Sequence, residues 1–326
     1  MKRPNQIGKI VYYSLILILV LVVIFSGLQI LESTIFNPVA EDAAPPSKTI
    51  TRDGVDYFPR QDITVMLVMG IDEFGPVQSS GSTSNPGAAD MVTLLIFDEK
   101  DEQTRILCLN RDTMLDVSVL GINGQKAGTT FAQLAIAHTY GSGMEDSCEN
   151  TRDTVSEFLY GITIDHYVSA NMDAINLMND AVDGVTVYVE DDFSAVDPTI
   201  TKGEVTLRGQ QAINFVRTRK NLGDQLNISR MERHKAYASG FMEAFREKMD
   251  DGEEFMLTLY ESIDPYIVTD CSVTVLTSMM ERYANYEIVE IVSPEGRNVM
   301  GEKYYEFHVD EQKLDQLILR LFYEVK

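Results

Sequence analysis

The sequence predicts an α/β protein that is preceded by one transmembrane helix. Near the N-terminus, residues 10–31 form an uncharged segment of 22 residues, IVYYSLILILVLVVIFSGLQIL. Farther along, three short apolar runs have the length of buried strands, and stretches with helix start and stop signals follow them. A chain that mixes such strands and helices is expected to build an α/β fold.

The uncharged segment matches the roughly 20 residues that a helix needs to cross the hydrocarbon core of a bilayer. The charges that flank it are basic before the segment and acidic after it: Lys2, Arg3 and Lys9, then Glu32 and Glu41. The positive-inside rule therefore places the tail, residues 1–9, in the cytoplasm and the remaining chain outside the cell membrane, after a single pass. A cleaved signal peptide is the alternative, but its apolar region spans only about 7–15 residues, so we favour a retained anchor.

Composition narrows the classes of function. The formal net charge of −23 argues against nucleic-acid binding, because phosphate backbones favour positively charged protein surfaces. A hydrophobic content of 44% is ample for a core. The three cysteines, Cys108, Cys148 and Cys271, are too few for a disulfide framework. Cys148 and Cys271 could pair only if the fold brings them together, which the sequence leaves open.

After the anchor, the chain divides into a stalk and a folded body. Residues 32–60 contain AEDAAPPSKT and little periodicity, as expected of an extracellular stalk, because Pro and small polar residues extend without packing. Residues 61–249 carry the strand and helix signals and form the main part of the expected folded body. Residues 250–326 alternate helix-like and strand-like patches, and we expect them to continue the same domain.

The three apolar runs allow a geometric inference about one edge of the sheet. They are ITVMLVMG (63–70), MVTLLIFD (91–98) and TRILCLN (104–110). Short connections favour antiparallel neighbours, so the end of the first run, the start of the second and the end of the third should meet. The residues at these points are Asp72, Asp90 and the pair Arg111–Asp112. The sequence therefore predicts carboxylates and an arginine clustered at this edge.

Helix and strand signals alternate beyond residue 130. Two expected helices end on glycine, and Asn150 is a good N-cap for the second of them: residues 130–141 and 150–161. Strands are expected at 162–170 and 184–190, around a helix near 171–182. Two more helices are expected at 210–217 and, after an N-cap at Ser229, at about 230–249.

A basic island interrupts this acidic chain at FVRTRKNLGDQLNISRMERHK, residues 215–235. Its four arginines, Arg217, Arg219, Arg230 and Arg233, present planar forks of donors that suit phosphate. If they faced Arg111, they would need an anion among them. Asp72 and Asp90 would tolerate a phosphate only with a bridging divalent cation, Mg²⁺ or alternatively Mn²⁺. Structural salt bridges among the same residues are the alternative that the pattern leaves open.

Other polar features are expected to be structural. His138 lies in the expected helix 130–141, and His166 follows Asp165 in an expected strand. A single histidine with no recognisable partner is more often a structural residue than a catalytic one or a ligand. The acidic run at residues 190–192 is expected to form a solvated loop.

Five motifs in this order resemble the LytR–CpsA–Psr family: VMGID (68–72), AADMVTLLIFD (88–98), LNRDTM (109–114), FVRTRK (215–220) and ISRMERH (228–234). The resemblance covers about residues 61–249. It implies a membrane-anchored enzyme that moves anionic glycopolymers, such as teichoic acid or capsule, from a polyprenyl-pyrophosphate carrier to peptidoglycan. It also implies an α-β-α sandwich around a central mixed or antiparallel sheet, with an apolar tunnel for the lipid.

The resemblance also assigns residue roles. Asp72 and Asp90 resemble the carboxylates that bind the metal. The residues that resemble the pyrophosphate site or belong to its motifs are Arg111, Arg217, Arg219, Asn227, Arg230, Arg233 and His234. Asp112 matches the aspartate beside Arg111. The sequence departs from the family pattern at several positions, among them Ala88 and Asn227, where the family often has an arginine and an aspartate, and Asn110, where it usually has a proline.

The leading hypothesis is therefore a Mg²⁺-dependent phosphotransferase in which Arg111, Asp112 and Arg230 are catalytic, and Asp90 or Asp112 is the base. Its expected partners are a lipid-linked glycan and peptidoglycan, with no nucleic acid. A hydrolase of polyprenyl pyrophosphate would use the same residues with water as acceptor. A non-catalytic protein that binds lipid-linked intermediates and regulates wall assembly is the third hypothesis, which the departures keep open.

Overall fold

The computed structural model describes residues 49–122, 124–218, 227–249, 253–272 and 286–325, together with positions 275, 278–279 and 282–283. The expected tail (1–9), the expected membrane anchor (10–31) and most of the expected stalk lie outside these residues. Within the described part of the chain, no helix combines the length and the apolar character that crossing a membrane requires.

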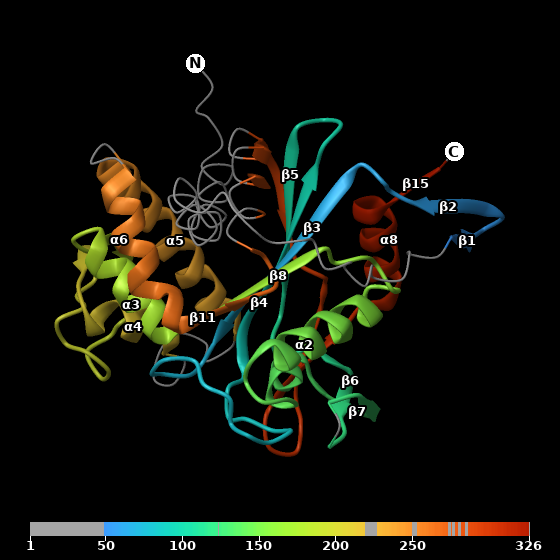
Figure 1. Ribbon diagram of the computed structural model, residues 1–326, viewed down its shortest axis with the longest axis horizontal. Helices are drawn as coiled ribbons and strands as arrows, with labels where there is room; N and C mark the ends of the chain where they lie inside the picture. Colours follow the sequence, from blue (N-terminus) through green and yellow to red (C-terminus); the bar gives the residue numbers. More distant parts are fainter. Residues whose placement is uncertain are drawn as a thin grey trace, which may run out of the picture.

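A six-stranded mixed sheet forms the centre of the molecule, in the order β11-β8-β3-β4-β5-β12 (Figure 1). Three strands form the antiparallel meander that the sequence predicted: β3 (Ile63–Ile71), β4 (Ala89–Asp98) and β5 (Gln103–Leu109). The other three strands are β8 (His166–Asn171), parallel to β3, β12 (Glu287–Val292), parallel to β5, and β11 (Ile267–Thr269), antiparallel to β8. The predicted α/β fold with a central mixed sheet is confirmed.

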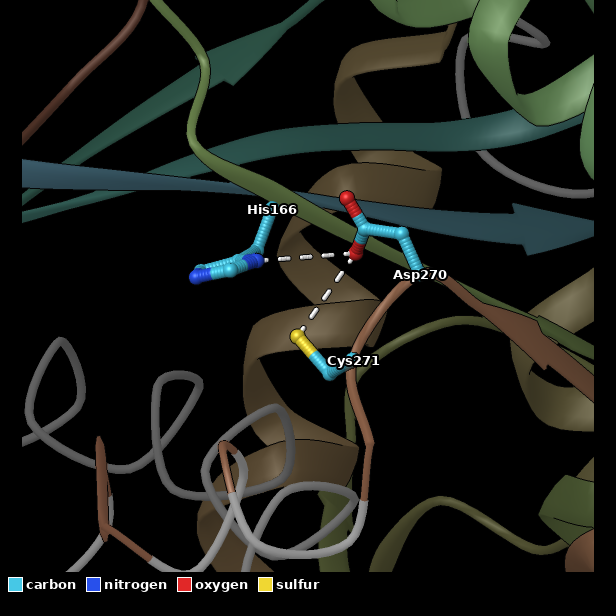
Figure 2. A group of neighbouring side chains, drawn as sticks. All are labelled: His166, Asp270 and Cys271. Carbon is cyan, nitrogen blue, oxygen red and sulfur yellow. Dashed lines mark hydrogen bonds and ion pairs between the residues drawn. The ribbon is translucent and has the colours of Figure 1, made fainter. Parts of the chain in front are cut away.

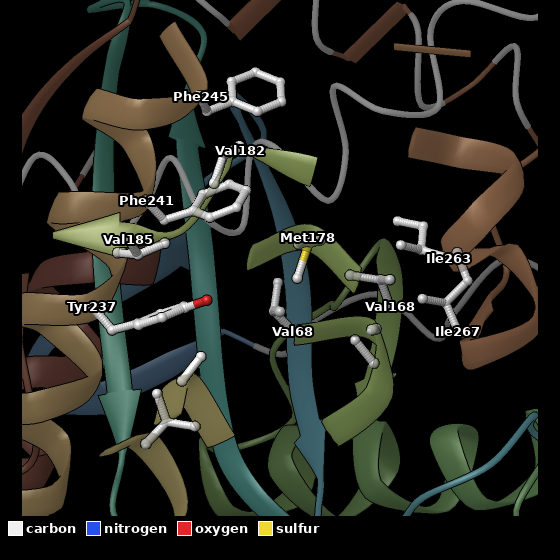
Figure 3. Close-up of a cluster of buried hydrophobic side chains, with 14 of the residues drawn as sticks. Val68, Val168, Met178, Val182, Val185, Tyr237, Phe241, Phe245, Ile263 and Ile267 are labelled. Atoms are coloured by element: carbon white, nitrogen blue, oxygen red, sulfur yellow. The ribbon is translucent and has the colours of Figure 1, made fainter. Parts of the chain in front are cut away.

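Both faces of the sheet are buried, because alternate residues of β4 enter different cores. Leu95 and Phe97 join one hydrophobic cluster, whereas Leu94 and Ile96 join the other. The first cluster packs under a helical layer and a two-stranded hairpin (Figure 3). These elements are α3 (Met172–Ala181), α4 (Gln210–Arg217), α5 (Asn227–Met249), α6 (Glu253–Ile263), β9 (Val185–Val189) and β10 (Gly203–Leu207).

The second cluster packs under α2 (Glu145–Phe158), α8 (Glu311–Phe322) and the 3-10 helix η2 (Leu134–Thr139), on the other side of the sheet (Figure 1). Asp310 caps the N-terminus of α8 by accepting from two backbone N–H groups, those of Gln312 and Lys313. With helices on both faces, the sheet is the middle layer of three, as in a sandwich.

Smaller sheets complete the periphery. Residues 50–59, expected in the stalk, instead form β1 (Ile50–Arg52) and β2 (Val55–Pro59), and β2 pairs with both β1 and the C-terminal β15 (Tyr323–Val325). Two hairpins extend from the body: β6 (Met114–Leu120) with β7 (Lys126–Gln133), and β13 (Gly296–Met300) with β14 (Tyr305–Val309). A short 3-10 helix, η3 (Asp264–Tyr266), leads into β11.

Two helix predictions were wrong at their starts. The expected helix 130–141 begins instead as strand β7 and continues as η2, because residues 126–133 pair with β6 and are largely exposed. The helix α2 begins at Glu145, so Asn150 is not an N-cap. The Asn150 side chain is buried and donates to the carbonyls of Ser118 and Ala137, which links α2 to β6 and η2.

Candidate functional site

The predicted cluster forms at the edge of the sheet where β3 and β5 end and β4 begins. Asp72 follows β3, and its backbone N–H donates to the carbonyl of Ala88 at 3.0 Å, which places Asp72 beside the start of β4. Arg111 follows β5 and forms an ion pair with Asp90 through Nη1 and Oδ1. Because the meander is antiparallel throughout, these three sequence-distant positions meet at one edge.

A β-bulge determines which way Asp90 faces. The register between β3 and β4 shifts after Gly70↔Met91, so that Ile71 pairs with Ala89 and Asp90 is the extra residue. Without the bulge, Asp90 would share a face with Val92 and point into the second core. Instead Ala89 is fully buried in that core, and the carboxylate of Asp90 contacts arginines.

Arg230 reaches the same carboxylate from α5, 140 positions farther along the chain. Its Nη1 donates to Oδ2 of Asp90 at 2.5 Å, and its Nη2 donates to the backbone carbonyl of Asp90 at 3.3 Å. The Arg230 residue is 1% exposed and Asp90 is 8% exposed. Each oxygen of the Asp90 carboxylate therefore binds a different guanidinium, and the group is held in a region that excludes most water.

An Asx turn positions Arg111. The side-chain oxygen of Asn110 accepts from the backbone N–H of Asp112 at 3.0 Å, and the Asn110 carbonyl accepts from Thr113. Asn110 thus stabilises the turn at the position where the family pattern usually has a proline. Asp112 is 4% exposed; its Oδ1 lies 3.5 Å from Nε of Arg111 and accepts from the side-chain amide of Gln133 at 3.2 Å.

Asp72 and Arg217 form a second, more exposed pair beside this cluster. Arg217 Nε donates to Oδ1 of Asp72 at 2.6 Å, and Nη2 donates to Oδ2 at 3.3 Å, in a fork geometry. The Arg217 guanidinium also lies over the ring of Phe74, 5.3 Å from its centroid. The side chain of Arg217 is 48% exposed and that of Asp72 is 28% exposed, so water and solutes reach this pair.

Arg233 caps the C-terminus of α4. Its Nε donates to the carbonyl of Phe215 at 3.0 Å, Nη2 donates to the carbonyl of Thr218, and Nη1 binds Asp191 at 2.8 Å. The last carbonyls of a helix have no partner within the helix, and basic side chains satisfy them well. The acidic run at residues 190–192 is a loop, as expected, with Glu190 and Asp192 exposed, and its middle residue, Asp191, makes the contact with Arg233.

His234 supports the same helix end. Its Nε2 lies 2.8 Å from the carbonyl of Val216, so Nε2 carries the proton and donates this bond. Burial, reinforced by the nearby positive charge of Arg230, lowers the pKa of His234 to about 3. The imidazole is therefore neutral near pH 7. Arg233 and His234 together hold the segment that presents Arg217.

Two of the predicted residues cannot be placed among these contacts. Arg219 lies outside the described residues, and the side chain of Asn227 does too, although its backbone begins α5. Because α5 begins at Asn227, Ser229 lies inside the helix, and the expected N-cap at Ser229 was wrong. Gln133 was not predicted to belong to the site; its amide bridges Asp112 and the carbonyl of Tyr305, a contact without a local sequence signal.

The carboxylates of Asp72 and Asp90 have the chemistry that a small divalent cation requires. Mg²⁺ prefers hard oxygen ligands and is commonly held by one or two carboxylates together with substrate phosphates and water. The two aspartates lie on neighbouring strands at one edge, and the Asp72 side chain is partly exposed. These carboxylate oxygens therefore fit Mg²⁺ or Mn²⁺. They become available to the metal when the arginines that now bind them bind an anion instead.

A cleft of about 410 Å³ opens beside Asp72. It lies between the loop after β3, the end of β8 and η3, and its lining includes both sequence neighbours of Asp72, together with Phe74, Asn171 and Tyr266. Polar and aromatic side chains of this kind suit a sugar-sized molecule, which requires hydrogen bonds and a flat apolar contact.

The model of the LytR_cpsA_psr family matches residues 36–322 of the chain. A relative named polyisoprenyl-teichoic acid–peptidoglycan teichoic acid transferase TagU, from Halalkalibacterium halodurans, is 31% identical over 58% of this chain. That match spans only 57% of the relative's own length. A protein of the same name from Oceanobacillus iheyensis is 24% identical over 93% of this chain and 89% of its own.

Solved structures share the fold. Bacillus subtilis TagT is 22% identical, with a TM-score of 0.57 over 80% of this chain and 90% of that one. A structure titled "TagT bound to LI-WTA" has a TM-score of 0.59, also at 22% identity and with the same coverage of the two chains.

Proposed function

This chain belongs to the LytR–CpsA–Psr family, and from that premise we propose that it is a glycopolymer–peptidoglycan phosphotransferase. It takes an anionic glycopolymer from a polyprenyl-pyrophosphate carrier and joins it to peptidoglycan. One observation carries the proposal: arginines from three separate segments, Arg111, Arg217 and Arg230, converge with Asp72 and Asp90 at a single edge of the sheet. The names of the TagU relatives, which are such transferases, support it.

The arrangement suits a diphosphate because the ion pairs can exchange partners. Each guanidinium at the edge now donates to a carboxylate oxygen. A diphosphate offers the same planar pairs of oxygens with more charge, so it competes for these donors. The carboxylates that it displaces are those that suit a divalent cation. When bound there, Mg²⁺ or Mn²⁺ would neutralise charge on the diphosphate, which is its usual part in phosphoryl transfer.

The arginines divide the work according to their burial. Arg230 is buried at Asp90, and the side chain of Arg111 beside it is only 12% exposed, so low solvent exposure strengthens their interaction with developing charge. They would stabilise the charge that grows on the departing polyprenyl phosphate. Arg217, which is exposed, would guide and hold the outer part of the diphosphate. We assign Arg233 and His234 to positioning, because both bind the end of α4 that presents Arg217.

The reaction is a substitution at the phosphorus that bears the sugar. A hydroxyl oxygen of peptidoglycan forms a bond to this phosphorus, and the bond from phosphorus to the bridging oxygen breaks. Polyprenyl phosphate leaves with the bonding electron pair, and the hydroxyl proton passes to a carboxylate. Asp112 is the better base of the two candidates, because it has a single guanidinium neighbour at 3.5 Å and accepts from the neutral amide of Gln133, whereas both oxygens of Asp90 accept from guanidinium groups.

We further propose that residues 10–31 anchor the protein in the cell membrane and that the folded body lies outside, because a lipid-linked donor stays at that surface. We propose that the acceptor sugar binds in the cleft beside Asp72. This cleft lies next to the carboxylate–arginine cluster, and the side chains of the cluster do not occupy it.

The test uses the full-length chain in detergent with a labelled, lipid-pyrophosphate-linked saccharide and peptidoglycan oligomers, with Mg²⁺ or with a chelator. We expect metal-dependent transfer of the label to peptidoglycan. Release of soluble sugar phosphate without transfer would instead identify a hydrolase. Tight binding of the lipid without turnover, across several saccharides, would contradict the enzyme proposal and favour a binding protein.

A further inference from the structure

Three potential metal ligands meet at the end of β8 that lies opposite the arginine cluster (Figure 2). His166 is the first residue of β8, and Asp270 and Cys271 directly follow β11. Because β8 and β11 are antiparallel neighbours, the start of one lies beside the end of the other. None of these residues has a part in the proposed transfer. His166, which follows Asp165 in the sequence, was expected to be structural.

The geometry of the three side chains is close to that of a tetrahedral site. Oδ1 of Asp270 lies 3.7 Å from Nδ1 of His166 and 3.6 Å from Sγ of Cys271. All three ligand atoms lie within 4.8 Å of one another. Zinc bonds of about 2.0–2.3 Å at tetrahedral angles separate ligand atoms by about 3.3–3.6 Å. The two Asp270 distances are within a few tenths of an ångström of this range, and His166 and Cys271 would need to approach each other by no more than roughly 1.5 Å.

We propose that His166, Asp270 and Cys271 bind a divalent transition-metal ion, for which Zn²⁺ is the best match. A sulfur and an imidazole nitrogen exclude Mg²⁺ and Ca²⁺, which prefer oxygen ligands. Zinc binds all three of these ligand types, Cys sulfur, His nitrogen and carboxylate oxygen. The thiol of Cys271 would lose its proton to the solvent on binding, and water would fill the fourth position.

The surroundings favour a cation. Cys271 is 7% exposed, whereas the side chains of His166 and Asp270 are 21% and 25% exposed, which leaves the ion a route from solvent. Two further carboxylates, Asp165 and Glu149, lie nearby. Asp165 directly precedes His166, and Glu149 lies within electrostatic reach of Asp270. A bound cation would offset this concentration of negative charge.

The backbone already holds the ligands in place. Asp270 Oδ1 accepts a hydrogen bond of 2.9 Å from the backbone N–H of Tyr167, a residue 103 positions earlier in the chain. The backbone N–H of Cys271 donates to the hydroxyl of Thr269 at 3.1 Å. The ligands are therefore presented by paired strands rather than by a flexible loop, and little ordering is needed when the ion binds.

Such an ion would cross-link the start of β8 to the end of β11, and so close the long segment between these strands into a loop. The chain between β8 and β11 contains α3, α4, α5 and α6, the layer that supplies Arg217 and Arg230. A cross-link that closes a long loop stabilises mainly by restricting the unfolded chain. The ion is therefore expected to stabilise the fold without touching the arginine cluster, so this inference does not depend on the proposed function.

The test titrates the chelator-treated, full-length chain with Co²⁺ alone, whose absorption reports thiolate ligation, and then with Zn²⁺. We expect one equivalent of Co²⁺ to give a thiolate-to-cobalt charge-transfer band, and Zn²⁺ to abolish it by competition. Zn²⁺ should also raise the melting temperature, because it binds the folded chain in preference. The variant Cys271→Ser should lose the band, and Asp270→Asn, whose amide oxygen can still accept from Tyr167, should bind at least about tenfold more weakly.

The matched control is Cys108→Ser, which removes a thiol of β5 that is remote in the sheet order and should leave the band unchanged. The inference is wrong if the wild type gives no charge-transfer band. It is equally wrong if the band survives in Cys271→Ser, or if Zn²⁺ raises the melting temperature of wild type and Cys271→Ser alike. Circular dichroism of each variant verifies that loss of binding is not loss of folding.

Discussion

Strand β4 carries a buried aspartate at each end, and each aspartate binds two arginines. At one end, Asp90 binds Arg111 and Arg230. At the other, Asp98 is fully buried and binds Arg60 Nη2 at 2.8 Å and Arg105 Nη1 at 2.7 Å. The two clusters have the same composition, yet we assign catalysis to one and a structural role to the other, so a buried Asp–Arg–Arg group is not by itself a sign of function.

The difference lies in where the arginines come from and what else they bind. Around Asp98, each arginine also binds a side chain two positions away: Arg60 binds Asp62 at 3.0 and 3.1 Å, and Arg105 binds Gln103 at 3.2 Å. At the Asp90 end, Arg230 arrives from 140 positions away, and a partly exposed aspartate–arginine pair and a cleft lie beside the cluster. Convergence of distant segments next to accessible space is what favours a binding site.

The largest expected effect concerns the structural end. Asp98→Ala should lower the free energy of unfolding by about 3–5 kcal/mol, because it leaves the guanidinium groups of Arg60 and Arg105, whose side chains are 13% and 20% exposed, without their shared buried carboxylate. Turnover per folded molecule should not change. Urea denaturation measures the first quantity, and the label-transfer assay at low temperature measures the second. An unchanged unfolding free energy would mean that Asp98 is not a structural counterpart of Asp90.

The next effect concerns the catalytic end. Arg111→Lys keeps the charge but loses the planar fork, so turnover should fall by about 100- to 1,000-fold, the usual loss when one preorganised donor to a developing charge is removed. The melting temperature should change little. Wild-type turnover in this variant would remove Arg111 from the diphosphate site, and Arg105→Lys, at the Asp98 end, is the matched control that should retain activity.

A pH experiment distinguishes the edge of the sheet from the residues that bind the end of α4, Arg233 and His234. The folded pKa of His234 is lowered to about 3 by burial, below the ordinary value of 6.5. The unfolded chain therefore takes up a proton below pH 6.5 while the folded chain does not, so His234 destabilises the fold progressively as pH falls from 6.5 to 3. The slope approaches about 1.4 kcal/mol per pH unit. His234→Gln should remove this contribution in denaturation at a series of pH values, and an unchanged slope would contradict it.

The smallest effect is expected at the exposed pair. Arg217→Ala should change the free energy of unfolding by only about 0.2–1 kcal/mol, because solvent-exposed ion pairs are weak. Turnover should fall by about tenfold, less than at Arg111, because water screens an exposed guanidinium. The assay should be repeated at raised salt, where the difference between Arg217→Ala and wild type should shrink. A loss equal to that of Arg111→Lys would contradict the division of roles by burial.

The sequence predicted the edge of the sheet well because its signals there are local. Apolar runs with short connections indicated the meander, and its topology alone brings Asp72, Asp90 and Arg111 together. Helix α4, predicted at residues 210–217, has those limits in the structure. The bulge at Asp90 could not be predicted, because one extra residue in a strand leaves no mark in an apolar run.

The sequence could not separate arginines that look alike. Arg230 and Arg233 lie three residues apart on α5, and both were predicted to bind pyrophosphate. The packing of α5 against α4 directs Arg233 to the carbonyls of Phe215 and Thr218, while Arg230 reaches the sheet. The same limit explains the misassigned helix at 130–141, where pairing with β6 outweighed a helix-like pattern. Partners that are distant in sequence decide such cases.

The most direct test of the account compares Asp90→Asn with Asp98→Asn in the label-transfer assay, with the folded fraction of each variant measured by circular dichroism. Both changes keep the shape of a buried side chain that pairs with two arginines. We expect Asp90→Asn to abolish metal-dependent transfer to peptidoglycan, and Asp98→Asn to retain it per folded molecule. Equal activity in the two variants would contradict the assignment of the active site to the Asp90 end of β4.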